Sequence, residues 1–408
     1  MSDKPSNLLV LQGGGPTPVL NASLCAVIEE AVESRKFKKV LGARRGIEGL
    51  TKGEIADLSH ISAHDLAQIR QTPGASLGTT RFKPAPADLD MIIANLAQHN
   101  VHTLILIGGN GSLRGAHAIS QASGAAGYDL RVIGVPKTVD NDIPGTDRCP
   151  GYASAARYIA QSVRDLGCDV AALPQPVSIL ETMGRSVGWL AAATALAKTT
   201  DRDAPHLIYL PEHAFDTNRF IADVDRTVSK IGHAVVVVNE GIRTADGKLV
   251  YEVATSTQRD ALDRALPGGV ANYLADVITQ NLKIRCRSEK PGLCGRASML
   301  HLSKQDWRDA DLVGRAAVRA AIDGQSDVMV SLLPITVGGY DLVALDSAAG
   351  KDRPIPADWL DAGELGVNQH FLSYVRPLVG DLLAYAPPLS LTAPAASNEV
   401  QPESLTRV

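Results

Sequence analysis

The chain has 408 residues, of which 45% are hydrophobic and 21% are charged, and its formal net charge is −4. This length and composition predict a globular protein of two or three domains with a substantial core. The lysines and arginines are spread along the chain, which argues against a nucleic-acid-binding surface, and no apolar run reaches the ~18–20 residues of a membrane span.

Short apolar runs alternate with helical patterns from one end of the chain to the other. The runs are continuous rather than interrupted by polar residues, which is typical of strands buried on both faces of a parallel sheet. Strands are predicted at 8–11, 101–107, 131–135, 177–181, 206–210, 234–238 and 328–333, and helices at 21–35, 87–99, 152–167, 186–198, 216–231, 268–283 and 308–323. This alternation predicts an α/β fold of two doubly wound, Rossmann-like domains with mostly parallel sheets and an active-site cleft between them.

Two glycine clusters each follow a predicted strand directly. QGGGPTPVLNAS comes after 8–11, and GGNGSLRGA comes after 101–107. Glycines between a strand and a helix let backbone N–H groups approach a phosphate, and the helix N-terminus adds favourable charge. Both the dinucleotide fingerprint and the P-loop fail, because Pro18 stands at the third glycine position and no glycine precedes Lys-Ser or Lys-Thr. The clusters predict an unusual phosphate ligand, with tight turns as the alternative.

The acidic stretch VPKTVDNDIPGTD follows the predicted strand 131–135, at the strand end where open α/β sheets bind ligands. Phosphoryl transfer needs charge stabilisation, a metal and a proton acceptor. Lys137 can hold phosphate oxygens, Asp142 can help to bind Mg²⁺, and Asp140 can accept the proton of an attacking hydroxyl. On spacing alone, a solvated acidic turn is an equally good interpretation.

Several motifs resemble those of the phosphofructokinase family, most of all its pyrophosphate-dependent branch. They occur in the family's order, as GGPTPVLNA (14–22), LGTTRF (77–82), GGNGS (108–112), PKTVDND (136–142), MGRSVGW (183–189), PE (211–212) and PGLCGR (291–296). The resemblance implies transfer of a phosphoryl group from pyrophosphate to the 1-hydroxyl of fructose 6-phosphate, with Mg²⁺ as the cofactor.

The resemblance also implies roles for individual residues. The expected catalytic residues are Asp140, Lys137 and Thr138, and the expected metal ligands are Asn110 and Asp142. The expected donor-binding residues are Gly14, Gly15, Arg81, Gly109, Gly111 and Ser112. The sugar phosphate is expected to contact Thr138, Asp140, Met183, Gly184, Arg185, Glu212, Arg287 and Arg296.

Departures from the family pattern leave the donor and the acceptor open. Lys137 is typical of pyrophosphate-using members, whereas Gly111 leaves room for the α-phosphate of ATP. We favour pyrophosphate, with an ATP-dependent kinase as the alternative and a non-catalytic sugar-phosphate-binding regulator as a third hypothesis. Asn110 replaces the family's usual metal-binding aspartate, and Pro176 and Leu293 replace residues near the sugar phosphate. Another acceptor, such as sedoheptulose 7-phosphate, therefore stays open.

The organisation of the chain is predicted as two interleaved domains and an extension. Residues 1–145 with about 255–305 are expected to form the phosphoryl-donor domain, and 146–254 with about 306–345 the sugar-phosphate domain. Residues 346–408 are expected to form a C-terminal extension, whose Pro-, Ala- and Ser-rich tail from about 386 is predicted to be mobile. The resemblance implies a homo-oligomer, a dimer or a tetramer.

The cysteines and the N-terminus bear on the compartment. The five cysteines are odd in number and form no CxxC pair, which argues against a zinc site or a disulfide framework. The N-terminal MSDKPSN does not read as a signal peptide. We therefore expect a cytoplasmic protein.

Overall fold

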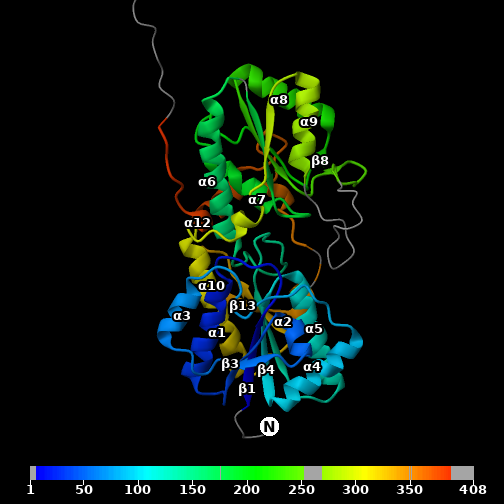
Figure 1. The fold of residues 1–408 in the computed structure, drawn as a ribbon, viewed down its shortest axis with the longest axis vertical. Helices are drawn as coiled ribbons and strands as arrows, with labels where there is room; N and C mark the ends of the chain where they lie inside the picture. Colours follow the sequence, from blue (N-terminus) through cyan, green and yellow to red (C-terminus); the bar gives the residue numbers. More distant parts are fainter. Residues whose placement is uncertain (1–5, 175, 252–268, 349, 351, 387–408) are drawn as a thin grey trace, which may run out of the picture.

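A computed structural model describes residues 6–174, 176–251, 269–348, 350 and 352–386. The chain forms two α/β lobes stacked along the long axis of the molecule, with the N-terminal strands in the lower lobe of Figure 1 and the green segments in the upper lobe. Each lobe is built on its own sheet, and most strand pairs in both sheets are parallel. The predicted fold of two doubly wound domains is confirmed.

The larger sheet has seven strands in the order β13-β12-β5-β4-β1-β2-β3. The outer pairs β2–β3 and β12–β13 are antiparallel, and the inner pairs are parallel. The strands are β1 (Asn7–Gln12), β2 (Val40–Ala43), β3 (Ile55–Asp57), β4 (Val101–Gly108), β5 (Arg131–Pro136), β12 (Val328–Leu332) and β13 (Tyr340–Ala344). Because β1, β4 and β5 are parallel neighbours, the loops that follow them emerge side by side at one edge of this sheet.

Helices cover both faces of the larger sheet. Leu8 and Val10 of β1 pack on one face, and Leu9 and Leu11 pack on the other, so the whole strand is buried. The first face is covered by α1 (Leu20–Ser34), α3 (Ala63–Arg70) and α10 (Lys304–Ile322). The second face is covered by α2 (Gly46–Thr51), α4 (Pro86–Gln98), α5 (Asn110–Ala125) and α11 (Leu345–Ala348). This two-sided burial explains why the strand sequences are continuously apolar.

The smaller sheet has four parallel strands in the order β11-β6-β9-β7. They are β6 (Val177–Thr182), β7 (Leu207–Tyr209), β9 (Ala234–Asn239) and β11 (Cys286–Glu289). One face is covered by α8 (Thr217–Ile231) and α9 (Val270–Leu282), and the other by α6 (Tyr152–Ala171), α7 (Trp189–Ala193), η1 (Thr194–Ala197) and α12 (Gln369–Val379). Short β8 (Ala214–Phe215) and β10 (Arg243–Thr244) pair with each other, and η2 (Gly292–Arg296) and η3 (Ala357–Trp359) complete the elements.

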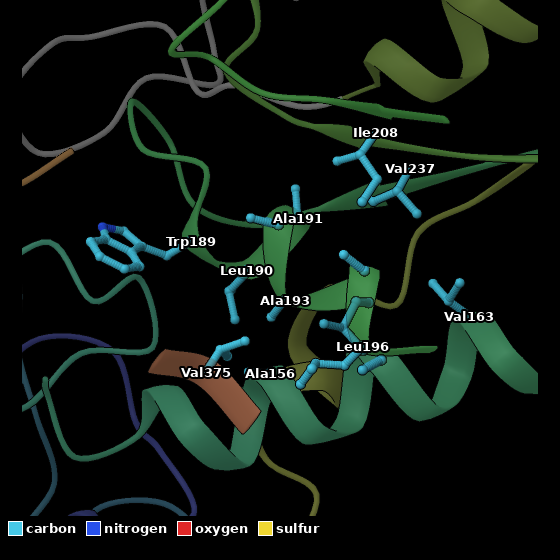
Figure 2. Packing of buried hydrophobic residues seen from close by; sticks show 14 of the residues in the cluster. Ala156, Val163, Trp189, Leu190, Ala191, Ala193, Leu196, Ile208, Val237 and Val375 are labelled. Carbon is cyan, nitrogen blue, oxygen red and sulfur yellow. The ribbon is translucent and has the colours of Figure 1, made fainter. Parts of the chain in front are cut away.

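The core under α6 joins this sheet to the end of the chain. Figure 2 shows Ala156 of α6 near Leu196 of η1 and Val375 of α12, with Trp189 at the side of the cluster. Trp189 is fully buried and lies within ring-contact distance of Trp359 and Tyr374. From Ile355 to Val379, the C-terminal extension is therefore packed into the core of the smaller domain.

The predicted division of the chain between the two domains is wrong for two segments. β11 lies within 255–305, which was expected in the first domain, but it pairs with β6 of the smaller sheet. α10, β12 and β13 lie within or beside 306–345, yet β12 pairs with β5 of the larger sheet. The chain thus returns to the first domain after α9 and β11 are complete. Residues 252–268 and the tail 387–408 lie outside the described residues, and among those described no helix has the length and apolarity to cross a bilayer.

Candidate active site

The loops after β1, β4 and β5 are joined by backbone hydrogen bonds. The amide of Gly13 donates to the carbonyl of Ile107 at 2.8 Å, and the amide of Lys137 donates to the carbonyl of Gly108 at 3.0 Å. The amide of Gly14 donates to the carbonyl of Thr80 at 3.2 Å, which brings the LGTTRF segment to the same place. The structure therefore brings together the two glycine clusters and the acidic turn.

Close approaches explain the glycines of the first cluster. A Cβ atom at Gly15 would lie 2.8 Å from a terminal nitrogen of Arg296, and one at Gly13 would lie 2.4 Å from the Ser112 hydroxyl. Gly14 has a φ of +77°, a conformation that L side chains rarely adopt. Side chains here would displace Ser112 and Arg296, two of the predicted site residues.

Lys137 is buried beneath the first glycine cluster. Its Nζ donates to the carbonyl of Gly15 at 2.7 Å, and this bond uses one of the three N–H groups of the ammonium. Burial lowers the pKa of Lys137 to about 8, although the negative charges of Asp140 and Asp142 oppose the shift. The side chain is therefore still mostly a cation at neutral pH, and it contacts the first glycine cluster.

Asp140 and Asp142 lie close together, and each is only partly exposed to solvent. Burial is the main cause of the raised pKa of Asp140, and the charge of Glu240 adds to it, while Arg185 and Lys137 oppose it. Burial and the charge of Asp140 raise the pKa of Asp142. The Oδ1 atom of each carboxylate is buried and has no hydrogen-bond partner among the described residues. A buried oxygen without a hydrogen-bond partner raises the free energy of the folded state unless a ligand donates to it or coordinates it.

Asn110 completes a set of oxygens suited to a divalent cation. It begins α5, and its Nδ2 donates to Oδ2 of Asp142 at 3.0 Å. Its own Oδ1 is buried and also lacks a partner among the described residues. No three His, Cys, Asp or Glu side chains of the described chain lie close enough to bind a metal by themselves. This donor set fits an ion such as Mg²⁺, which commonly takes one or two carboxylates and completes its shell with phosphate oxygens and water.

Arginines approach the acidic turn from two sides. Arg296, at the end of η2, contacts the Gly15 loop, and burial together with the charge of Arg81 lowers the pKa of its guanidinium, while Asp140 opposes this shift. Arg185 follows β6 with a φ of +52°, and its backbone amide donates to Oε1 of Glu240 at 3.3 Å. These arginines of the smaller domain, together with Lys137 and Arg81 of the larger one, place positive charge around the acidic turn.

Other predicted residues lie near this cluster and support its loops. Oγ1 of Thr138 accepts a hydrogen bond from the amide of Asp140 at 3.1 Å, which fixes the acidic turn. The carbonyl of Met183 accepts from Nδ2 of Asn239 at 3.3 Å, and Gly184 has a φ of +137°. Gly109 caps α5, and a Cβ atom at Gly111 would meet nothing within 4 Å.

Glu212 belongs to the smaller domain and stands beside the MGRSVGW segment. Its Oε1 accepts hydrogen bonds from the amides of Gly188 at 2.9 Å and Ile355 at 3.3 Å. Its Oε2 is buried without a partner among the described residues, and burial raises its pKa. Glu212, which was expected to contact the sugar, therefore uses one of its oxygens to bind two backbone amides.

Arg287 lines a different region from this cluster, and its contact with the sugar phosphate stays a prediction. Arg287 lies on the edge strand β11 and lines a separate cavity of about 280 Å³ together with Leu173, Ser178 and Arg285. None of the other predicted site residues lines this cavity. The spacing of Arg287 from PGLCGR gave no information on which end of β11 it occupies.

Two acids at the site were missed by sequence reasoning. Glu240 directly follows β9, and its position at the carboxyl end of a buried strand could have been recognised. Asp352 comes from the C-terminal extension, and its Oδ1 accepts from Nδ2 of Asn110 at 3.2 Å. No local pattern connects two residues that are 242 positions apart.

The fold is that of a two-domain α/β protein in which two glycine clusters, a buried lysine and an acidic turn meet at one edge of the larger sheet. A profile described as Phosphofructokinase matches residues 7–320. The chain is 40% identical over 385 residues to the pyrophosphate--fructose 6-phosphate 1-phosphotransferase of Xanthomonas campestris, covering 91% of each chain. It is also 34% identical to the sulfofructose kinase of Alkalicoccus urumqiensis, covering 79% of this chain and 82% of that one.

A solved structure is similar over nearly the same length. The pyrophosphate-dependent phosphofructokinase of Nitrosospira multiformis superimposes with a TM-score of 0.83 at 32% identity, covering 94% of this chain and 95% of the other. The chain belongs to the phosphofructokinase family, as its motifs predicted.

Proposed function

We propose that the protein transfers a phosphoryl group from pyrophosphate to the 1-hydroxyl of fructose 6-phosphate, giving fructose 1,6-bisphosphate and phosphate. The observation that carries this proposal is the buried ammonium of Lys137, bonded to the Gly15 carbonyl and close to Asp140. A compact cation at this position balances a small, highly charged donor that brings no nucleoside to bind. The Xanthomonas relative is named for the same reaction.

The larger domain would bind the donor. Lys137 and Arg81 supply positive charge, and the N-terminus of α5 adds partial charge and backbone N–H groups. The proposed donor-binding residues are Gly14, Gly15, Arg81, Gly109, Gly111 and Ser112. Asp142 and Oδ1 of Asn110 would hold Mg²⁺, which neutralises charge on the phosphates when it is bound.

The acceptor would lie between Asp140 and the smaller domain. Asp140 takes the proton of the 1-hydroxyl while that oxygen bonds to phosphorus and the bridging P–O bond of pyrophosphate breaks, which releases phosphate. The raised pKa of Asp140 suits a general base near neutral pH. Arg185 and Arg296 would bind the sugar phosphate, with Met183, Gly184, Glu212 and Glu240 shaping its site, and Thr138 would position Asp140.

A donor and acceptor screen tests this proposal. The purified protein is incubated with Mg²⁺, fructose 6-phosphate and either pyrophosphate or ATP, and bisphosphate formation is followed by a coupled assay. We expect kcat/KM with pyrophosphate to exceed that with ATP by at least about 10-fold, a difference of about 1.4 kcal/mol. Turnover with ATP alone would overturn the donor, and no turnover with any acceptor would favour a binding protein.

Two observations make the additional arms of this screen necessary. The open space at Gly111 favours ATP as the second candidate donor. Leu293 is exposed on η2 next to Arg296, and one relative is named a sulfofructose kinase, so sedoheptulose 7-phosphate and sulfofructose are tested as acceptors. A kcat/KM for either of them above that for fructose 6-phosphate would correct the acceptor. A cytoplasmic location and a homo-oligomeric state stay predictions from the sequence.

A further inference from the structure

The side-chain amide of Asn110 has one favourable orientation. Its Nδ2 lies 3.0 Å from Oδ2 of Asp142, 3.3 Å from the carbonyl of Asp142 and 3.2 Å from Oδ1 of Asp352. Rotating the amide by 180° would place its oxygen against two carboxylates and a carbonyl, all of which are acceptors. The hydrogen-bond network therefore assigns the nitrogen to this side and directs Oδ1 away from it. That Oδ1 is buried, and it has no partner among the described residues.

Asp352 is also hydrogen-bonded to a loop of the smaller domain. Its Oδ2 accepts a hydrogen bond from the Ser186 hydroxyl at 2.6 Å, and Ser186 belongs to the MGRSVGW segment after β6. Asp352 thus bridges the first turn of α5 in the larger domain and a loop of the smaller domain. Each of its two oxygens has a specific partner, so the carboxylate is fixed at both ends.

The residue after Asp352 anchors this segment to the core. The guanidinium carbon of Arg353 lies 4.5 Å from the centre of the Trp189 ring, and Nε1 of Trp189 donates to the Arg353 carbonyl at 2.9 Å. Arg353 also donates to the carbonyls of Asn141 and Asp147, on the acidic turn. The contacts of Arg353 therefore fix the backbone next to Asp352 relative to the acidic turn, and the exposed Asp352 side chain is held by its two hydrogen bonds.

Asp352 also adds negative charge without joining a three-acid metal site. Its charge is one of the causes that raise the pKa of both Asp140 and Asp142. Yet no three acidic, His or Cys side chains of the described chain are close enough to hold one ion. Asp352 is therefore not one of three carboxylates that bind a cation directly. It can influence a bound cation through its hydrogen bond to Asn110 and through the electrostatic potential of its negative charge.

We propose that Asp352 is a positioning residue for the cation site: it orients the Asn110 amide so that Oδ1 faces the cation, and it supplies the negative charge that an asparagine lacks. This inference rests on the proposed function, because it assumes that a divalent cation binds with the donor. Outer partners that orient a ligand typically contribute 10- to 100-fold to metal affinity.

Metal binding, rather than turnover, is the primary test. Mn²⁺ is titrated into the full-length protein with methylenediphosphonate, a pyrophosphate analogue that cannot transfer its phosphoryl group, and free Mn²⁺ is followed by electron paramagnetic resonance. We expect Asp352→Ala to weaken Mn²⁺ binding by about 10-fold or more. Asp352→Asn keeps an acceptor for Asn110 and loses only the charge, so its expected loss is about 3-fold. Asp358→Asn, an exposed acid of the same extension, is the matched control.

A rescue variant separates this role from general damage to the fold. A carboxylate at position 110 offers oxygen in either orientation and restores the charge, so Asn110→Asp combined with Asp352→Ala should recover affinity to within about 3-fold of wild type. The Mg²⁺ concentration for half-maximal turnover should follow the same order, with a smaller change in kcat at saturating Mg²⁺. If Asp352→Ala does not fold, Ser186→Ala, which removes one anchor, and Asp352→Asn carry the test.

The possible outcomes show separately whether the role of Asp352 or the proposed phosphotransferase function is wrong. Wild-type protein that binds no Mn²⁺ with the diphosphonate overturns the proposed function and the inference with it. Wild-type binding with an unchanged Asp352→Ala variant overturns the inference alone. Equal losses in Asp352→Ala and Asp352→Asn, or no rescue by Asn110→Asp, overturn the positioning role.

Discussion

The two halves of the site are built in different ways. The half on the larger sheet comes from loops after three neighbouring strands, β1, β4 and β5, and its charged side chains Lys137, Asp140 and Asp142 are largely buried. The half on the smaller domain comes from loops after β6 and β9, from η2 and from the C-terminal extension. Its arginine Arg185 is exposed, and Arg296 is half-buried.

The charges of the donor half are held in place by one domain. The charges of the acceptor half reach the same place only because the two domains are packed together. Lys137 is buried and the two aspartates are only partly exposed, so these charges are screened less by water and interact more strongly with one another and with an anionic ligand. The exposed guanidinium of Arg185 and the half-buried one of Arg296 are screened more by water and interact less strongly until a ligand excludes it. Substitutions in the donor half should therefore change the chemical step most, and substitutions in the acceptor half should change sugar binding most.

The largest effect is expected for the proposed base. Asp140→Ala should lower kcat by about 10²–10⁴-fold, because the 1-hydroxyl loses its proton acceptor. Fructose 6-phosphate binding, measured by calorimetry without a donor, should change little, since the arginines remain. Asp140→Asn keeps the shape of the side chain and serves as its isosteric control. A kcat within a few-fold of wild type in both variants would remove Asp140 from the chemical step.

The second largest loss of turnover is expected when the buried ammonium of Lys137 is removed. Lys137→Met should lower pyrophosphate-dependent kcat by about 10²–10³-fold, as losing one preorganised donor to a charged transition state typically does. Thermal unfolding should change far less than turnover, because methionine fills a similar volume. Equal activity of the variant and the wild type with pyrophosphate would contradict the donor half as described.

The pH dependence of kcat/KM provides a second test of the roles of Asp140 and Lys137. Asp140 acts when ionised, so kcat/KM should fall as pH decreases through its raised pKa, well above the ordinary aspartate value of about 3.9. Lys137 acts when protonated, so kcat/KM should fall as pH increases through about 8. The basic limb should disappear in Lys137→Met. A basic limb that persists unchanged would assign it to another group.

The same comparison explains what the sequence could and could not predict. Continuous apolar runs marked β1, β4, β5, β6, β9 and β12, because these strands are buried on both faces, and the motifs after β1, β4 and β5 stand at neighbouring strand ends. Edge strand β11 reads CRSE and has no such run, so neither its sheet nor the position of Arg287 could be deduced. Asp352 was not predictable, because its place depends on packing of Arg353 on Trp189, a contact between distant segments.

A smaller effect is expected on the free energy of unfolding. Burial and neighbouring acids raise the pKa of Asp142, so its ionised form destabilises the folded state at pH values above that pKa. Asp142→Asn should raise the free energy of unfolding by about 1–3 kcal/mol at pH 8 with a chelator present. The gain should shrink as the pH falls through the raised pKa toward the unfolded value, because the wild-type carboxyl then becomes protonated. Denaturant titrations at pH 8 and pH 5 measure both quantities.

The control for this experiment is the metal itself. Mg²⁺ with pyrophosphate should stabilise the wild type more than Asp142→Asn, because only the wild type offers a carboxylate at this position. Equal stabilisation of both proteins would exclude Asp142 as a ligand, and a variant less stable than wild type at pH 8 would contradict the unfavourable burial.

The smallest change in activity is expected for substitutions of Gly111, beside which the donor half of the site has free space. It lies in the first turn of α5, which has no acidic residue, and a Cβ atom there would meet nothing within 4 Å. Gly111→Asp should therefore fold normally and gain about 0.3–1 kcal/mol from the helix N-terminus. If the space at Gly111 admits the α-phosphate of ATP, the new carboxylate should repel it and lower the ratio of ATP- to pyrophosphate-dependent kcat/KM by about 10-fold or more. Gly111→Ala adds a Cβ without charge and should leave this ratio near its wild-type value. An unchanged ratio in Gly111→Asp would mean that discrimination between donors rests on Lys137 and the buried charges, and not on the space at the start of α5.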